Sequence, residues 1–186
     1  MPTASVNGLE IYYEQYGDPS GAPLLLICGL GAQITGWPRG FLDALSDGGF
    51  FVISYDNRDV GLSSNLNHLG DPDAGAILFG QTPPPYTIAD MAADGAALLA
   101  HLNLGPVHVV GVSMGGMIAQ QFAIDFPKLT LTLTSIMSTP APLEVGTSTP
   151  ECAAMLTRPR SEDLETFLLE EIENWKLTSG SGYELD

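Results

Sequence analysis

The chain has 186 residues, enough for one domain with a sizeable core, and 45% of them are hydrophobic. Acidic residues outnumber basic ones by 22 to 6, so the formal net charge is −16. This imbalance argues against nucleic acid or an anionic membrane surface as a partner, because phosphate binding needs a basic surface. The apolar runs are also too short to span a bilayer.

The two cysteines, Cys28 and Cys152, lie far apart in the sequence. We expect them to be free thiols in a reducing compartment rather than a disulfide. Residues 1–5 have neither the basic region nor the apolar segment of a signal peptide. Together these features predict a cytoplasmic protein.

The predicted elements alternate between strands and helices. Asn7-Gly8, between residues of strand character, predicts an opening hairpin. Apolar runs of strand length follow at residues 24–28, 50–55, 107–112 and 129–137. Apolar residues at helical spacing lie between them at residues 38–46, 88–102 and 117–126, and Thr87 with Asp90 predicts a capping box at the second of these. This order indicates an α/β protein whose mostly parallel sheet has helices on both faces.

Two segments depart from the alternation. Residues 56–85 are rich in Gly, Pro, Asn and Asp and are expected to form a long surface excursion. From Ser138 the composition shifts to loops and two helical patterns, near residues 151–156 and 162–175. We therefore expect an α/β core over residues 1–138 and a separate helical segment over residues 139–186.

The sequence Gly111-Val112-Ser113-Met114-Gly115 connects a predicted strand to a predicted helix. This is the context of a nucleophile elbow, in which a serine occupies the tip of a very tight turn. Glycine on either side removes Cβ clashes, and the start of the helix favours the negative charge that develops on an attacked carbonyl. The alternative is a Gly-rich turn with an incidental serine. The flanking strand and helix favour Ser113 as a nucleophile.

Three loops are expected to meet at one edge of the sheet. Residues 29–33, the segment that begins at Asp56, and Ser113 each follow a predicted strand. In parallel sheets, reactive groups gather at the carboxyl ends of the strands. The sequence therefore predicts one candidate site at this edge.

Four ordered motifs resemble the N-terminal part of the α/β-hydrolases. They are residues 24–31, Gly36-Trp37-Pro38, residues 55–63 and the Gly-x-Ser-x-Gly sequence. They are most similar to a bacterial branch of small esterase-like hydrolases that includes the aclacinomycin methylesterases. The resemblance covers about Val6 to Met137 and more loosely the tail, which looks like the beginning of a helical lid.

The resemblance implies a role for the loop after the strand at residues 24–28. The backbone N–H groups of Leu30 and Met114 would form an oxyanion hole. The family usually has His where this chain has Cys28, but main-chain donors do not depend on that side chain. The segment from Asp56 to Ser63 is expected to brace the loop, and Cys28 to be buried and inert. The alternative for residues 29–31 is an ordinary tight turn.

The catalytic base is the main departure from the family. Family members place an acid and then a histidine after the serine, whereas His68, His101 and His108 all precede Ser113. We expect His108 to be a core or half-buried residue, His101 to end a helix, and His68 to be a remote alternative as the base. The family's last strands are missing, so we expect a chain truncated within its lid.

The sequence thus predicts a serine hydrolase that acts on a small-molecule carboxylic ester, with no metal or cofactor. One alternative is an aminopeptidase of the same fold that removes N-terminal proline. Another is a catalytically inactive binding or interaction module. The strand at residues 129–137 would lie at a bare sheet edge, which favours self-association.

Overall fold

The computed structural model of the chain describes residues 2–70, 73, 76–77, 80–140, 145, 148–159 and 161–179. The chain divides into two compact units, described separately below. The sheet unit is Met1–Pro72 with Pro84–Val145, and the helical unit is Asp73–Pro83 with Gly146–Asp186. Parts of the predicted surface excursion at residues 56–85 and of the predicted loops beyond residue 139 lie outside the described residues. The predicted division at residues 138 and 139 stays a prediction.

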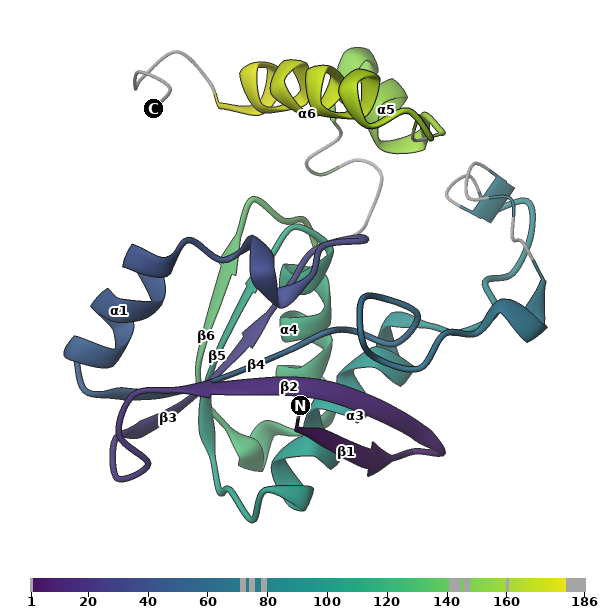
Figure 1. Cartoon of the computed structure of the whole chain (residues 1–186). Helices are drawn as coiled ribbons and strands as arrows, with labels where there is room; N and C mark the ends of the chain where they lie inside the picture. Colours follow the sequence, from purple (N-terminus) through teal and green to yellow (C-terminus); the bar gives the residue numbers. More distant parts are fainter. Residues whose placement is uncertain are drawn as a thin grey trace. The chain divides into compact units, whose positions relative to one another are not determined.

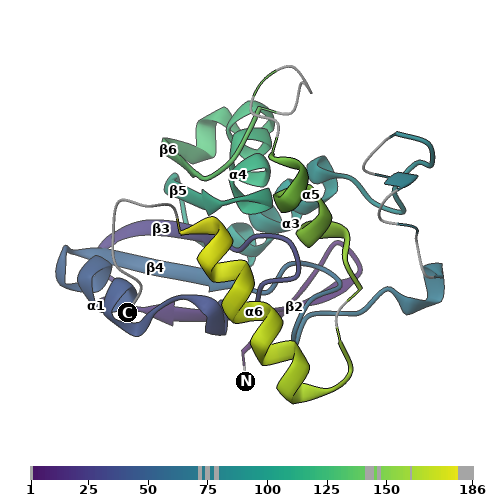
Figure 2. The ribbon, with the colours of Figure 1, turned by 90° about the horizontal axis from the view of Figure 1, so that it is seen from above.

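The sheet unit contains a six-stranded, mostly parallel sheet in the order β1-β2-β4-β3-β5-β6. The strands are β1 Thr3–Val6, β2 Leu9–Tyr16, β3 Ala22–Ile27, β4 Phe50–Tyr55, β5 Val107–Val112 and β6 Thr130–Ile136. Strand β3 pairs in parallel with β4 and β5, and β5 pairs in parallel with β6. Figure 2 shows β6, β5, β3, β4 and β2 following one another across the sheet. The predicted α/β class is confirmed.

The hairpin of β1 and β2 is antiparallel, as predicted. Asn7 and Gly8 both have positive φ, at 51° and 77°. Two such residues form the turn whose twist matches that of the flanking strands. Strand β2 then pairs antiparallel with β4 and joins the hairpin to the parallel part of the sheet.

Helices cover both faces of the sheet (Figure 1). Helix α1 Arg39–Asp47 lies on one face, and α3 Ile88–His101 and α4 Met114–Asp125 lie on the other. Alternate residues of β3 enter the two cores: Leu24 packs on the α1 side with Leu42, and Leu25 on the α3 and α4 side with Phe122. The predicted capping box is present at Thr87 and Asp90. Short 3₁₀ turns lie at η1 Ile34–Gly36, η2 Asn67–Leu69 and η3 Pro127–Leu129.

The helical unit contains α5 Pro150–Thr157 and α6 Leu164–Thr178, close to the predicted ranges. Each begins at a side-chain cap, Thr149 for α5 and Asp163 for α6. No helix in the described part of the chain is both long and apolar enough to cross a membrane.

Strand β6 lies at one edge of the sheet and pairs only with β5 among the described strands. Its apolar side chains are only partly covered: Leu131 is 53% exposed and Leu133 is 42% exposed. An uncharged edge strand with free backbone groups can pair with another copy of itself. Within the described residues, β6 is therefore an edge strand, as predicted.

We predict that the chain self-associates through β6, increasingly at higher ionic strength. The net charge of −16 opposes association at low salt, and salt screens it. The substitution Leu131→Lys should suppress association because it places a charge on the edge. The control Ile124→Lys, at an exposed position of α4, should not. Light scattering over a salt series checks this, and a monodisperse monomer at every salt concentration would contradict it.

Candidate active site

Ser113 stands between β5 and α4, in the predicted strand–turn–helix context. It is the N-cap residue of α4, with φ of 55° and ψ of −123°. A non-glycine residue in this region is strained, and such strain often accompanies functional positions. The helix begins at Met114, one turn earlier than the apolar pattern from Met117 predicts. The pattern misses this turn because Gly115 and Gly116 carry no side chains to mark a helical face.

The glycines of the motif are required by close backbone contacts. A Cβ on Gly111 would lie 2.0 Å from the carbonyl oxygen of Gly115. A Cβ on Gly115 would lie 2.3 Å from the carbonyl oxygen of Ile27 in β3. The start of α4 is therefore pressed against the ends of both β5 and β3, which only glycine at these two positions permits.

The loop after β3 lies beside Ser113. A Cβ on Gly29 would lie 3.3 Å from the Cβ and 3.8 Å from the Oγ of Ser113. The next residue, Leu30, is 60% exposed, and its N–H has no acceptor in the described part of the chain. As the first residue of α4, Met114 likewise has an N–H without an intrahelical partner. Met114 thus follows the serine directly in sequence, and Leu30 follows the glycine that lies beside the serine in the fold.

Asp56 joins the loop after β3 to the loop after β4. Its carboxylate is 1% exposed and accepts hydrogen bonds from the backbone N–H groups of Ile34 and Leu62, each at 2.9 Å. The adjacent Asn57 donates its side-chain N–H to the carbonyl oxygen of Cys28 at 3.1 Å. These contacts confirm the interpretation of the Asp56 segment as structural support.

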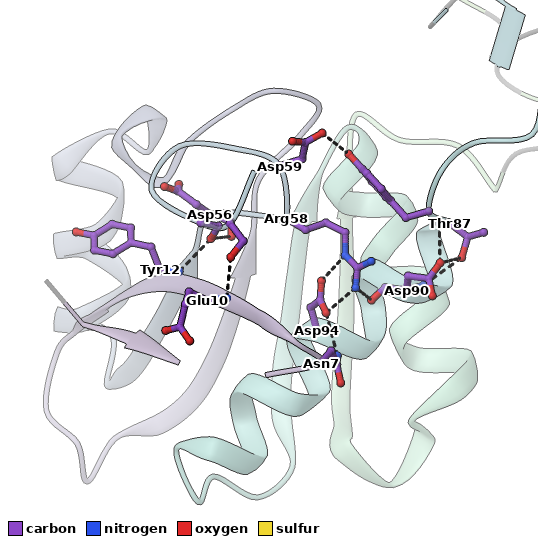
Figure 3. Close-up of polar contacts among 12 residues, drawn as sticks. Asn7, Glu10, Tyr12, Asp56, Arg58, Asp59, Thr87, Asp90 and Asp94 are labelled. Atoms are coloured by element: carbon purple, nitrogen blue, oxygen red, sulfur yellow. Dashed lines mark hydrogen bonds and ion pairs between the residues drawn. The ribbon is translucent and has the colours of Figure 1, made fainter. Parts of the chain in front are cut away.

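An ion pair that sequence reasoning missed anchors the same segment to α3 (Figure 3). Arg58 donates through Nε and Nη2 to the two carboxylate oxygens of Asp94, at 2.7 and 2.8 Å. Asn7 of the hairpin turn donates to the same carboxylate at 2.9 Å. The sequence does indicate a partner for Asp94, because this acid interrupts the apolar face of α3, three residues after Met91.

Cys28 is buried, as expected. Its side chain is 2% exposed, and burial raises the pKa of the thiol to about 12. The thiolate, which is the reactive form, is therefore suppressed at neutral pH. Both Cys28 and Cys152 are free cysteines.

None of the three histidines hydrogen-bonds Ser113. His108 is half-buried in β5, one of the two predicted positions, and shares a hydrogen bond of 2.8 Å with Thr132 of β6. His101 is the exposed last residue of α3. His68 is exposed in η2. Among the described residues there is also no cluster of His, Cys, Asp and Glu that could hold a metal ion.

A mostly parallel sheet, a serine turn flanked by glycines and a loop held by buried hydrogen bonds are together typical of a hydrolase fold. The chain belongs to the alpha/beta hydrolase fold family, whose family model matches residues 22–181.

Similar proteins include esterases. Rhodomycin D methylesterase DnrP of Streptomyces peucetius is 33% identical over 208 residues, covering 100% of this chain and 65% of the relative. The chain thus spans less than two thirds of that relative's length. A carboxylesterase structure from the thaumarchaeon Nitrososphaera gargenis is 27% identical with a TM-score of 0.62, covering 87% of this chain and 59% of the other.

A further solved structure shares the fold. The enol-lactonase from Burkholderia xenovorans LB400 has a TM-score of 0.63 at 23% identity, over 95% of this chain and 65% of the other. At that identity the likeness shows the fold alone.

We predict that Asp56→Asn lowers the free energy of unfolding by about 1.5–3 kcal/mol, because a buried N–H loses a charged acceptor. The amide of asparagine cannot accept from both Ile34 and Leu62. The control Asp43→Asn, in an exposed pair with Arg39 on α1, should change it by less than about 0.5 kcal/mol. Urea unfolding measures both. Equal effects of the two substitutions would show that Asp56 does not brace the loops.

We also predict that Cys152 reacts with thiol reagents faster than Cys28 does. Burial of Cys28 should in addition make the free energy of unfolding depend on pH. In the native chain at pH 8, a thiol reagent should modify Cys152 and leave Cys28 unmodified. The pKa of Cys28 rises to about 12 on folding, so above about pH 8.5 the unfolded state loses a proton that the native state keeps. The free energy of unfolding should therefore fall as the pH rises toward 12, less steeply in Cys28→Ala. Rapid native modification of Cys28, or identical slopes, would contradict this.

Proposed function

We propose that Ser113 is the nucleophile of a serine hydrolase that acts on small carboxylic esters. The observation that carries the proposal is the strained backbone of Ser113 at the start of α4, with a glycine loop alongside. The similarity to rhodomycin D methylesterase supports an ester as the substrate class. We place the activity in the cytoplasm, which is consistent with two free cysteines.

In the proposed reaction, Ser113 Oγ attacks the ester carbonyl carbon and gives up its proton to a base. The N–H groups of Leu30 and Met114 would stabilise the oxyanion, together with the positive end of the α4 dipole. Collapse of the tetrahedral intermediate breaks the bond to the alkoxy group, which takes a proton and leaves as the alcohol. Water then attacks the acyl-serine and releases the acid. In this scheme the donors are main-chain groups, so they are in place before substrate arrives.

No described residue is placed to act as the base in this reaction. His108 shares its hydrogen bond with Thr132, and neither His68 nor His101 hydrogen-bonds Ser113. A serine without a base stays protonated and is a weak nucleophile. This one observation favours a second candidate function, a binding module of the same fold that performs no turnover.

Phenylboronic acid tests the nucleophile without needing turnover. The hydroxyl of Ser113 adds to boron, one proton is released, and the tetrahedral adduct mimics the oxyanion intermediate. We predict that the 186-residue chain forms this adduct, as seen by boron NMR. Ser113→Ala should abolish it, and the control Ser20→Ala, at an exposed serine, should retain it. An adduct that survives Ser113→Ala, or no adduct at all, would refute the assignment.

The rate of substrate hydrolysis distinguishes the remaining candidate functions. Without a base, hydrolysis of p-nitrophenyl butyrate by the chain should exceed the rate in water by no more than about 10³–10⁴-fold. His68→Ala should leave that rate unchanged. Fast turnover that His68→Ala abolishes would assign the base to His68. Preference for L-proline p-nitroanilide over the ester would favour the aminopeptidase alternative.

A further inference from the structure

Two strained residues, one of which is the candidate nucleophile, lie at either end of one backbone hydrogen bond. Five non-glycine residues of the described chain have positive φ, and three of them are Asn or Asp, which tolerate it best. The other two are Ser113, with φ of 55°, and Met137, with φ of 48°. They flank one hydrogen bond, in which the N–H of Ser113 donates to the carbonyl oxygen of Ile136 at 2.9 Å. Strain of this kind persists only where the surrounding contacts hold it.

One side chain holds the chain on both sides of Met137. The amide nitrogen of Gln120, in the second turn of α4, donates to Ser135 Oγ at 3.1 Å and to the carbonyl oxygen of Thr139 at 3.3 Å. One contact is thus to the end of β6 and the other to the turn that follows it. Gln120 links the helix that begins at Ser113 to the turn whose carbonyl holds the N–H of Ser113.

The same turn is packed directly on the start of α4. A Cβ on Gly116 would lie 2.5 Å from the Cβ of Ser138 and 2.8 Å from the Oγ of Ser135. Because a Cβ is fixed to its backbone, the turn itself would have to move. The buried Oγ of Ser138 has no hydrogen-bond partner in the described part of the chain, an unfavourable burial that the packing nonetheless maintains. We name Gly116, Gln120, Ser135 and Ser138 the β6–α4 clamp.

We propose that Gln120 is a positioning residue for Ser113. By fixing Ser135 and Thr139, Gln120 fixes the carbonyl of Ile136, and that carbonyl holds the N–H of Ser113. The strained φ of Ser113 then directs both its own hydroxyl and the N–H of Met114. Gln120 contacts no reacting atom and acts through the backbone alone. The inference rests on the proposed function of Ser113 as a nucleophile.

The test compares neighbouring glutamines of α4 in the full chain. Gln120→Met keeps the side-chain length and removes both donors. Gln121→Met is the matched control, because in the described part of the chain Gln121 donates only to Asp125 of the same helix. The first readout is hydrogen exchange of the Ser113 amide, with the amide of buried Phe122 as the reference for overall stability. The second readout is the affinity for phenylboronic acid.

Gln120→Met should accelerate exchange at Ser113 and weaken phenylboronic acid binding, each by up to about tenfold, because the hydrogen bonds to Ser135 and Thr139 are both lost. Exchange at Phe122 should not change, and Gln121→Met should change neither readout. Unaltered exchange at Ser113 would overturn the inference. Faster exchange with unaltered affinity would also overturn it, because the clamp would then be structural only. If the parent chain binds no phenylboronic acid, the proposed function fails, and the exchange rate alone decides whether Gln120 holds Ser113.

Gly116→Ala provides a second variant in case Gln120→Met destabilises the whole chain, which faster exchange at Phe122 would reveal. Alanine is a better helix former than glycine, so an ordinary helical position would become more stable. Here its Cβ should displace Ser138, accelerate exchange at Ser113 and weaken phenylboronic acid binding. A stabilised chain with both readouts unchanged would overturn the inference.

Discussion

The structure depends on how closely the start of α4 approaches the ends of β5 and β3. At Gly111 and Gly115 there is no room for a Cβ, and in the turn between them Ser113 has a positive φ of 55°. The backbone strain is therefore concentrated at the residue that carries the hydroxyl. The same turn leaves the N–H of Met114 without an intrahelical acceptor. The proposed nucleophile and the proposed donor for its oxyanion thus arise from one backbone constraint.

The loops around this turn are held by buried polar groups. Asp56 bonds the backbones of two loops with one carboxylate, and Arg58 with Asp94 ties the same segment to α3. A buried carboxylate of this kind stabilises only when its oxygens are satisfied, as both are here. On the other side, Gln120 holds the turn after β6. The serine lies between two sets of fixed contacts, as electrostatic preorganisation of a site requires.

The sequence predicts the features that are local in the chain and misses those that depend on distant pairing. Asn7-Gly8, the cap at Thr87 and the serine turn each follow from a few adjacent residues. The contacts of Gln120 depend on the register of β6 against β5, which has an irregularity near its start. No local pattern encodes that register. Asp94 lies between these cases, because an acid on an apolar helix face signals a partner without identifying it.

The central claim is that Ser113 is the nucleophile, and the site of covalent modification tests it most directly. A fluorophosphonate forms a bond from phosphorus to the attacking oxygen as fluoride leaves and the serine proton is released. Peptide mass spectrometry then locates the modified residue. The account predicts slow but selective modification of Ser113. Modification spread over exposed serines such as Ser20, with Ser113 no more reactive than they are, would contradict it.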